Sequence, residues 1–132
     1  MISNNLDGLV FLRTLPTMPT TREYNFVADG KVVGFLQLRQ IPSAAKNLPK
    51  HFASHIYYEI IPEARGMGYG TELLSLAVKE ARALGIRELV VTVDESNITS
   101  CRVIEKNNGE LFDKAESPEG MVLAYRIPLL LE

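Results

Sequence analysis

Three glycines, Gly66, Gly68 and Gly70, stand at alternating positions between two apolar stretches of different period. The stretch before them, 55–61, alternates like a strand, and the stretch after them, 72–84, has the period of an amphipathic helix. The pattern predicts a strand, a tight loop and the first turn of a helix. The first backbone N–H groups of a helix lack intrahelical partners and carry the positive end of its dipole. Such a loop is therefore typical of a phosphate or pyrophosphate site.

Two common phosphate motifs do not fit this loop. A P-loop requires Lys-Ser/Thr directly after its last glycine, and here Thr71 and Glu72 follow Gly70. The dinucleotide fingerprint requires a third glycine three positions after the second, where this chain has Thr71 after Gly68. An NAD-binding interpretation keeps one supporting feature, which is Asp94 at the end of the next predicted strand. In that motif an acidic residue about 20 residues on binds a ribose hydroxyl.

Composition bounds the class of protein. The chain has 132 residues, of which 46% are hydrophobic, and a formal net charge of −2. We expect one domain over 1–132 with its own core, and no nucleic-acid or membrane partner. The first seven residues lack the basic and apolar parts of a signal peptide, so we expect a cytoplasmic location. The one cysteine permits no internal disulfide. His51 and His55 have no third ligand in view, so we expect no metal site.

Alternation, turn residues and helical periodicity predict the other elements. Asp29-Gly30 indicates a tight hairpin, Gly85 a helix C-terminal cap, and Gly34 a bulge or a close backbone approach. Val33 and Phe35 should share one face of their strand. The strands on either side of the long helix should be parallel neighbours joined by a right-handed crossover. The expected strands are 9–12, 23–28, 31–41, 52–61, 86–93, 110–113 and 120–127, the expected helices are 68–84 and 97–106, and loops are expected at 14–21 and 114–119.

The spacing Arg65-x-x-Gly68-x-Gly70 resembles the pyrophosphate loop of the GNAT family, the GCN5-related N-acetyltransferases, whose motif reads Gln/Arg-x-x-Gly-x-Gly/Ala. Asn97 after the next strand and the helix ending 103–109 are similar to this family as well, and the resemblance covers about 23–127. It implies an α/β (α+β) fold: a mixed, mostly antiparallel central sheet with a parallel strand–helix–strand crossover at the acetyl-CoA site. The N-terminal helical region is shortened.

The resemblance also implies acetyl-CoA as the cosubstrate. In this family the glycine loop holds the pyrophosphate, and a free backbone N–H on the preceding strand, here near Ile60 or Ile61, polarises the thioester carbonyl. The pantetheine arm pairs beside that strand like an added strand, and the asparagine contacts the arm. The cofactor-binding residues that it implies are Ile60, Ile61, Arg65, Gly66, Met67, Gly68, Tyr69, Gly70, Thr71, Asn97 and Ser100.

The chain departs from the family pattern at two places. Many members carry a tyrosine on the short helix that protonates the departing thiolate, and the matching position here is Ile104. The family usually has one or two helices between its first two strands, and the segment 15–22 is too short and proline-rich for them. The acceptor side is therefore open, built by a partner subunit, or lost.

Acetyl transfer to an amine needs a base for the amine and an acid for the thiolate. Glu59 is the candidate base, acting through water, with a solvated strand carboxylate as the alternative interpretation. Ser100, Tyr57 and Tyr58 are candidates for the acid, and we select Ser100. Nothing in the sequence supplies Cys101 with a base, so we expect it to be a small buried side chain.

The sequence therefore predicts an N-acetyltransferase that moves an acetyl group from acetyl-CoA directly to a primary amine. The acceptor is a small-molecule amine or a protein amine, and a homodimer is left open. Two alternatives remain: a non-catalytic acyl-CoA-binding module, and, less favoured, an NAD-binding domain.

Overall fold

A computed structural model describes residues 6–16, 18–43, 48–49 and 52–129. In these residues it contains seven strands, two α-helices and a short 3-10 turn. In chain order they are β1 (Leu6–Leu15), β2 (Met18–Ala28), β3 (Lys31–Ser43), β4 (Ser54–Ile60), η2 (Pro62–Ala64), α1 (Tyr69–Ala83), β5 (Glu88–Asp94), α2 (Ile98–Lys106), β6 (Glu110–Ser117) and β7 (Gly120–Pro128).

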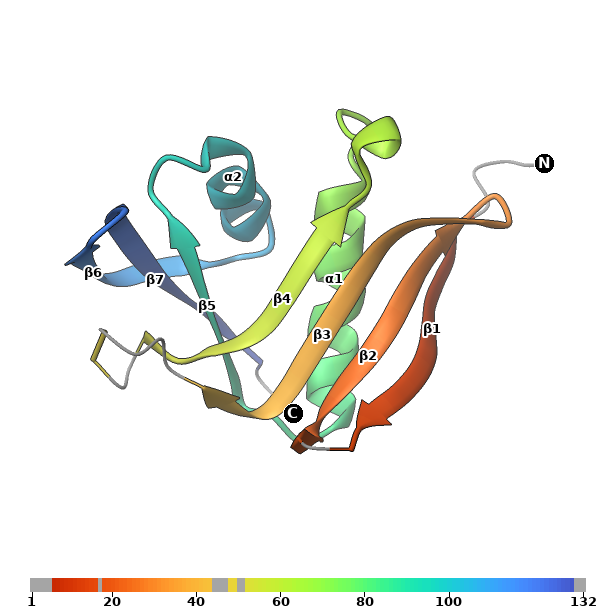
Figure 1. The fold of residues 1–132 in the computed structure, drawn as a ribbon, viewed down its shortest axis with the longest axis horizontal. Helices are drawn as coiled ribbons and strands as arrows, with labels where there is room; N and C mark the ends of the chain where they lie inside the picture. The colour runs from red at the N-terminus through yellow and green to blue at the C-terminus, as the bar shows by residue number, and fades with distance from the viewer. Residues whose placement is uncertain (1–5, 17, 44–47, 50–51, 130–132) are drawn as a thin grey trace.

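The strands form two antiparallel sheets, ordered β1-β2-β3-β4 and β5-β7-β6. Helix α1 lies behind the first sheet, and α2 lies above β5 at the open end of the gap between the sheets (Figure 1). The expected mixed, mostly antiparallel α/β fold is confirmed. Among the described residues no backbone ladder joins β4 to β5, so the strands flanking α1 are neighbours that separate rather than a paired parallel unit.

The N-terminal part differs from the expected loop at 14–21. Leu15 pairs with Met18, so β1 and β2 form a hairpin, and the described residues between them hold no helix. Pairing of β2 with β1 on one side and β3 on the other outweighs the turn propensity of the local prolines and threonines. The shortened N-terminal region is confirmed, although it is strand and not loop.

Asp29 and Gly30 both have positive φ, 53° and 74°, as the two central residues of a primed hairpin turn require. Shortly after this turn, Phe26 pairs with Gly34 but Val27 pairs with Val32, so Val33 is an extra residue in the ladder. The bulge turns Val33 into the core at 8% exposure and leaves Phe35 at 44%. The prediction that these two share a face is wrong for this reason.

Helix α1 buries one stripe against the first sheet, with Leu73, Leu74, Ala77 and Ala81 inaccessible. Gly85 ends it at φ 84°, donating to Arg82 O, and the next N–H donates to Ala81 O, so the predicted cap is confirmed. After α2, strands β6 and β7 extend further than expected. Their connection shrinks to Pro118 and Glu119 in place of the predicted loop at 114–119.

Candidate functional site

The gap between the two sheets is closed at one end by side chains of β4. His55 Nδ1 accepts a hydrogen bond of 2.9 Å from Val90 N–H on β5, and Ser54 Oγ lies 3.5 Å from Val90 O. His55 is 7% exposed, and burial lowers its pKa, so the neutral ring accepts this bond. Beyond this bridge the strands diverge toward their C-terminal ends (Figure 1). The local sequence gives no sign of this bridging role for His55, because its partner lies 35 residues away. From the sequence, the role considered for His55 is that of a metal ligand.

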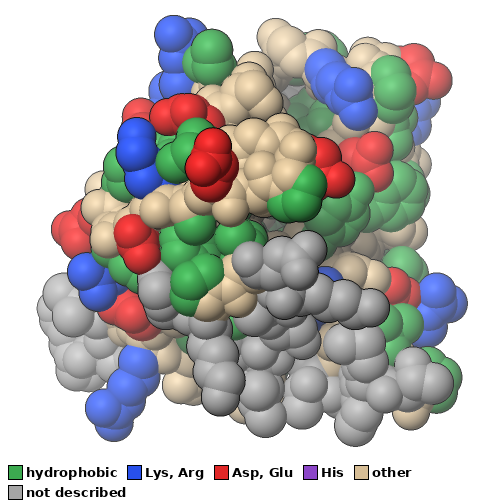
Figure 2. Space-filling view, turned by 60° about the vertical axis from the view of Figure 1, so that its left-hand side comes forward, with side chains coloured by type: hydrophobic (Ala, Val, Ile, Leu, Met, Phe, Trp, Pro, Cys, Tyr) green, Lys and Arg blue, Asp and Glu red, His purple; other side chains and the backbone are tan. Residues whose placement is uncertain are grey.

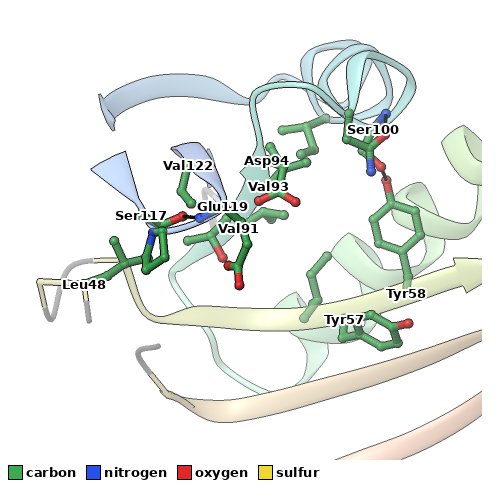
Figure 3. Close-up of a pocket in the computed structure, with 15 residues that line it drawn as sticks. Leu48, Tyr57, Tyr58, Val91, Val93, Asp94, Ser100, Ser117, Glu119 and Val122 are labelled. Carbon is green, nitrogen blue, oxygen red and sulfur yellow. Dashed lines mark hydrogen bonds between the residues drawn. The ribbon is translucent and has the colours of Figure 1, made fainter. Parts of the chain in front are cut away.

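The diverging strands enclose a cavity of about 470 Å³. Its walls come from β4, β5, the start of α2 and the turn between β6 and β7 (Figure 3). Two residues selected from the sequence, Asn97 and Ser100, line it together with Tyr58 and Ile104. The tertiary fold thus brings the short helix and the strand before the glycine loop to one site.

Tyr58 and Ser100 reach toward each other across this cavity, with Tyr58 Oη 3.4 Å from Ser100 Oγ (Figure 3). Burial is the largest influence on Tyr58 and raises its pKa, while the bond to Ser100 acts in the opposite direction. The Tyr58 hydroxyl is therefore protonated at neutral pH. Ile104, at the position of the family's tyrosine, is fully buried and contributes no polar atom.

The glycine loop joins β4 to α1 and leaves its backbone open. Gly66 and Gly68 have φ of 80° and 83°, and no heavy atom outside the adjacent residues lies within 4 Å of a Cβ built on either. Gly68 is the N-cap of α1, and its carbonyl accepts from Glu72 N–H. Within the described part of the chain, the N–H groups of residues 69–71 have no backbone partner, as expected in a first helical turn. The loop has the geometry of an anion site.

Gly70 and Asn107 hold the two helices close at this end of the molecule. A Cβ on Gly70 would lie 3.3 Å from Val103 Cγ2, so only a small residue fits there without adjustment of α2. The Asn107 side-chain amide donates to Thr71 O at 3.3 Å and to Val103 O at 3.1 Å. The start of α1 is thereby tied to the end of α2.

Arg65 folds back from the loop onto β4. Its Nε donates to Ile60 O at 2.9 Å, and its guanidinium lies 3.8 Å from the Glu59 carboxylate. The side chain is 58% exposed, so it can leave these partners for a bound anion at modest cost.

The free edge of β4 faces the gap between the sheets. Ile61 N–H donates to Val33 O at 3.0 Å, which directs the N–H of alternate residues toward β3. The N–H groups of Tyr58 and Ile60 therefore point to the opposite side, where β5 has separated. Of the two backbone donors suggested by the sequence, the one on Ile60 faces the gap and the one on Ile61 is paired in this structure.

Glu59 lies on the outer face of the first sheet and does not line the cavity of Tyr58 and Ser100. Its side chain is 48% exposed and lines a second depression of about 310 Å³, and its carboxylate lies 3.4 Å from Tyr57 Oη. Asn97 caps α2 by accepting from Ser100 N–H at 3.1 Å, which leaves its NH₂ group as a donor. Cys101 is partly buried, with its sulfur 4.0 Å from Asp94 O.

Two negative findings apply to the described residues. In them, no three histidine, cysteine, aspartate or glutamate side chains gather as a metal site would require, and His51 lies outside the described part. No helix of the described chain has the length and apolar character needed to cross a membrane. Acidic, basic and hydrophobic side chains are interspersed on the face shown in Figure 2.

The chain was compared with family models, with curated protein sequences and with solved structures. A model of the acetyltransferase (GNAT) family matches residues 12–109. No curated protein sequence matches the chain. The Salmonella typhimurium protein yncA, solved with its cofactor acetyl-CoA, has a TM-score of 0.68 and 18% identity, over 85% of this chain and 66% of that one.

Two further solved structures show the same fold. The aminoglycoside acetyltransferase AAC(6′)-Ib with coenzyme A and kanamycin has a TM-score of 0.70 and 16% identity, over 85% of this chain and 69% of its own. The N-acetyltransferase of Staphylococcus aureus Mu50 has a TM-score of 0.63 and 24% identity, over 83% and 68%. The chain spans about two thirds of the length of these proteins. With the family model matched across most of its length, this chain belongs to the acetyltransferase (GNAT) family.

Proposed function

We propose that this protein is an N-acetyltransferase that moves an acetyl group from acetyl-CoA directly to a primary amine. The observation that carries the proposal is the separation of β4 from β5 beside a glycine loop. One structure thereby offers an open strand edge and an anion site at the N-terminus of α1. An extended chain with a pyrophosphate at one end, such as the arm of acetyl-CoA, requires this combination.

The cosubstrate is held mainly by backbone. The N–H groups of residues 66–71 bind the pyrophosphate, and Arg65 turns from Glu59 to add a positive charge. The pantetheine arm lies along the free edge of β4, between Ile60 and the Asn97 and Ser100 side chains at the start of α2. The Ile60 N–H polarises the thioester carbonyl.

The acceptor amine reacts as the neutral base. Glu59 accepts its proton through a water molecule, because its carboxylate is exposed to solvent on the outer face of β4. The nitrogen then attacks the thioester carbonyl and the thiolate leaves. In direct transfer no residue of the chain forms a covalent intermediate. The residues of the site therefore act by positioning the two substrates and by moving protons.

The acceptor is a small-molecule amine that reaches the thioester from the outer face of β4. Glu59 lines the 310 Å³ depression on that face, whereas the 470 Å³ cavity on the other face receives the thioester end of acetyl-CoA beside Asn97 and Ser100. Kanamycin and ribostamycin, found with the similar AAC(6′)-Ib, support a small-molecule acceptor in place of a protein amine. We also propose a cytoplasmic location, where acetyl-CoA is available, for either a monomer or a homodimer.

One observation favours a second candidate, a non-catalytic acyl-CoA-binding module. Ile104 puts a buried aliphatic side chain where the family often has its acid. Such a module would bind acetyl-CoA tightly and transfer nothing to any amine.

Calorimetric titration with acetyl-CoA tests the cofactor site, with NAD as the control ligand. Gly68→Glu places a carboxylate against the pyrophosphate, and we expect it to abolish binding. Gly85→Glu is the matched control, because this glycine has nearly the same φ, 84°, equally open surroundings and a position at the other end of α1. Binding by wild type and Gly85→Glu, but not by Gly68→Glu, supports the site. Absence of acetyl-CoA binding by folded wild type would refute it. If wild type binds acetyl-CoA, an acetylation assay over an amine panel separates the enzyme from the non-catalytic module.

A further inference from the structure

Two hydroxyl groups approach each other from opposite walls of the cavity, Tyr58 from β4 and Ser100 from the first turn of α2. Figure 3 shows Tyr58 pointing away from Tyr57 and toward α2. We propose that Tyr58 is the catalytic acid that protonates the thiolate as it leaves the acetyl group. This assignment rests on the proposed acetyl transfer.

The position of Tyr58 suits a leaving-group acid. Adjacent strand residues point to opposite faces of a sheet, so Tyr58 and Glu59 lie on opposite sides of β4. Their surroundings agree, since Tyr58 is partly buried against the core and Glu59 is half exposed on the outer face. An amine activated beside Glu59 attacks from one side of the strand, and the sulfur departs toward the other, where the Tyr58 hydroxyl lies.

The chemistry favours Tyr58 over Ser100. An ordinary phenol has a pKa of about 10 and a thiol one of about 8.5, whereas an aliphatic hydroxyl is far less acidic than either. Burial raises the pKa of Tyr58, which keeps its proton in place at neutral pH until a thiolate forms nearby. The separation of 3.4 Å from Ser100 is long for a hydrogen bond between hydroxyls, so the Tyr58 O–H can turn to another acceptor.

Acetyl transfer exchanges a C–S bond for a C–N bond and moves two protons. The amine nitrogen forms a bond to the acyl carbon, the C–S bond breaks, and the sulfur takes the proton from Tyr58 Oη. The proton lost by the amine goes to Glu59 and then to solvent. The Tyr58 phenolate recovers a proton through the Ser100 hydroxyl, which returns one from solvent. Ser100 is therefore a proton-returning partner of the acid and not the acid itself.

The test is the rate of acetyl transfer by Tyr58→Phe, with Tyr125→Phe as the matched control. Tyr125 is another tyrosine whose hydroxyl links a strand to a helix, donating to Glu105 of α2 at 2.9 Å, and it lines neither the 470 Å³ cavity nor the depression beside Glu59. We expect Tyr58→Phe to lower kcat by about 100-fold or more, in the range of general acid catalysis. Its affinity for acetyl-CoA, measured by calorimetry, should stay within about threefold of wild type because backbone groups hold the cosubstrate. A kcat for Tyr58→Phe as high as that of Tyr125→Phe would overturn the proposal.

A second donor distinguishes an acid from a structural contact. With an acetyl thioester of a nitro-substituted arylthiol, whose thiolate leaves without a proton, the deficit of Tyr58→Phe relative to wild type should shrink. A deficit that is the same for both donors would assign Tyr58 a structural role and refute the inference.

Ser100→Ala keeps the proposal testable if Tyr58→Phe does not fold. We expect it to lose less than about tenfold in kcat, and a loss near 100-fold would assign the acid to Ser100. If wild type binds acetyl-CoA but acetylates no amine, the proposed function itself has failed, which is a different result from an active wild type with an active Tyr58→Phe.

Discussion

Removal of the acceptor on His55 should weaken the attachment of the two sheets. Val90 N–H points away from β7 and finds its partner in His55 Nδ1 at 2.9 Å, between the buried side chains of Leu89 and Val91. His55→Leu leaves this donor unpaired in the interior, which costs about 1–3 kcal/mol in the free energy of unfolding. For a chain of 132 residues this corresponds to a fall in Tm of about 4–11 °C.

Protonation of His55 should act in the same direction. Because its pKa is lowered in the folded state, the unfolded state binds more protons between that pKa and the ordinary value of about 6.5. The contribution of His55 to stability is therefore complete above the unfolded pKa. It is lost as pH falls through the folded pKa.

Urea unfolding of wild type, His55→Leu and His55→Asn between pH 5 and pH 7.5 measures both effects. The amide oxygen introduced by His55→Asn replaces Nδ1 as an acceptor that does not titrate. This variant should therefore keep most of the stability at pH 7.5 and lose less than wild type on acidification. His51 is present in both proteins, so its contribution to the pH dependence of stability cancels in the difference between wild type and His55→Asn. The reasoning is refuted if His55→Leu is within about 0.5 kcal/mol of wild type, the range of an ordinary surface substitution. Equal pH dependence of wild type and His55→Asn would refute it as well.

Two other predictions concern β3 and β4. An alanine at Gly34 would place its Cβ 2.7 Å from Glu59 O, so Gly34→Ala should lower the free energy of unfolding by about 1–3 kcal/mol, measured by urea unfolding; stability equal to wild type would show that β4 moves freely. Glu59→Gln should lower kcat by about 10²-fold or more at neutral pH, with the deficit shrinking as pH approaches the pKa of the acceptor amine, since the amine then needs no base. A pH–rate profile checks this, and an unchanged kcat at neutral pH would remove Glu59 from the mechanism.

Local sequence determined the elements around the glycine loop. The helical period of 72–84 and the cap at Gly85 predicted α1, and Asp29-Gly30 predicted its hairpin, because caps and turns depend on residues a few positions apart. The loop spacing, supported by the order of elements, was sufficient to indicate the family. The predicted cofactor residues and Glu59 remain predictions for the experiments above.

Only the tertiary structure decided how the strands separate and what faces the resulting gap. The bulge at Val33, the hairpin of β1 with β2, and the absence of a ladder between β4 and β5 in the described residues all depend on pairing between distant segments. The bridge from His55 to Val90 joins residues 35 apart, and the approach of Tyr58 to Ser100 joins residues 42 apart. Periodicity and turn chemistry report interactions within a few residues, whereas these contacts exist because the two sheets and two helices pack against one another. The sequence by itself therefore predicted the anion loop and the family. Only the packing of the chain brought the Tyr58 hydroxyl to α2, a helix on which Ile104 supplies no acidic group.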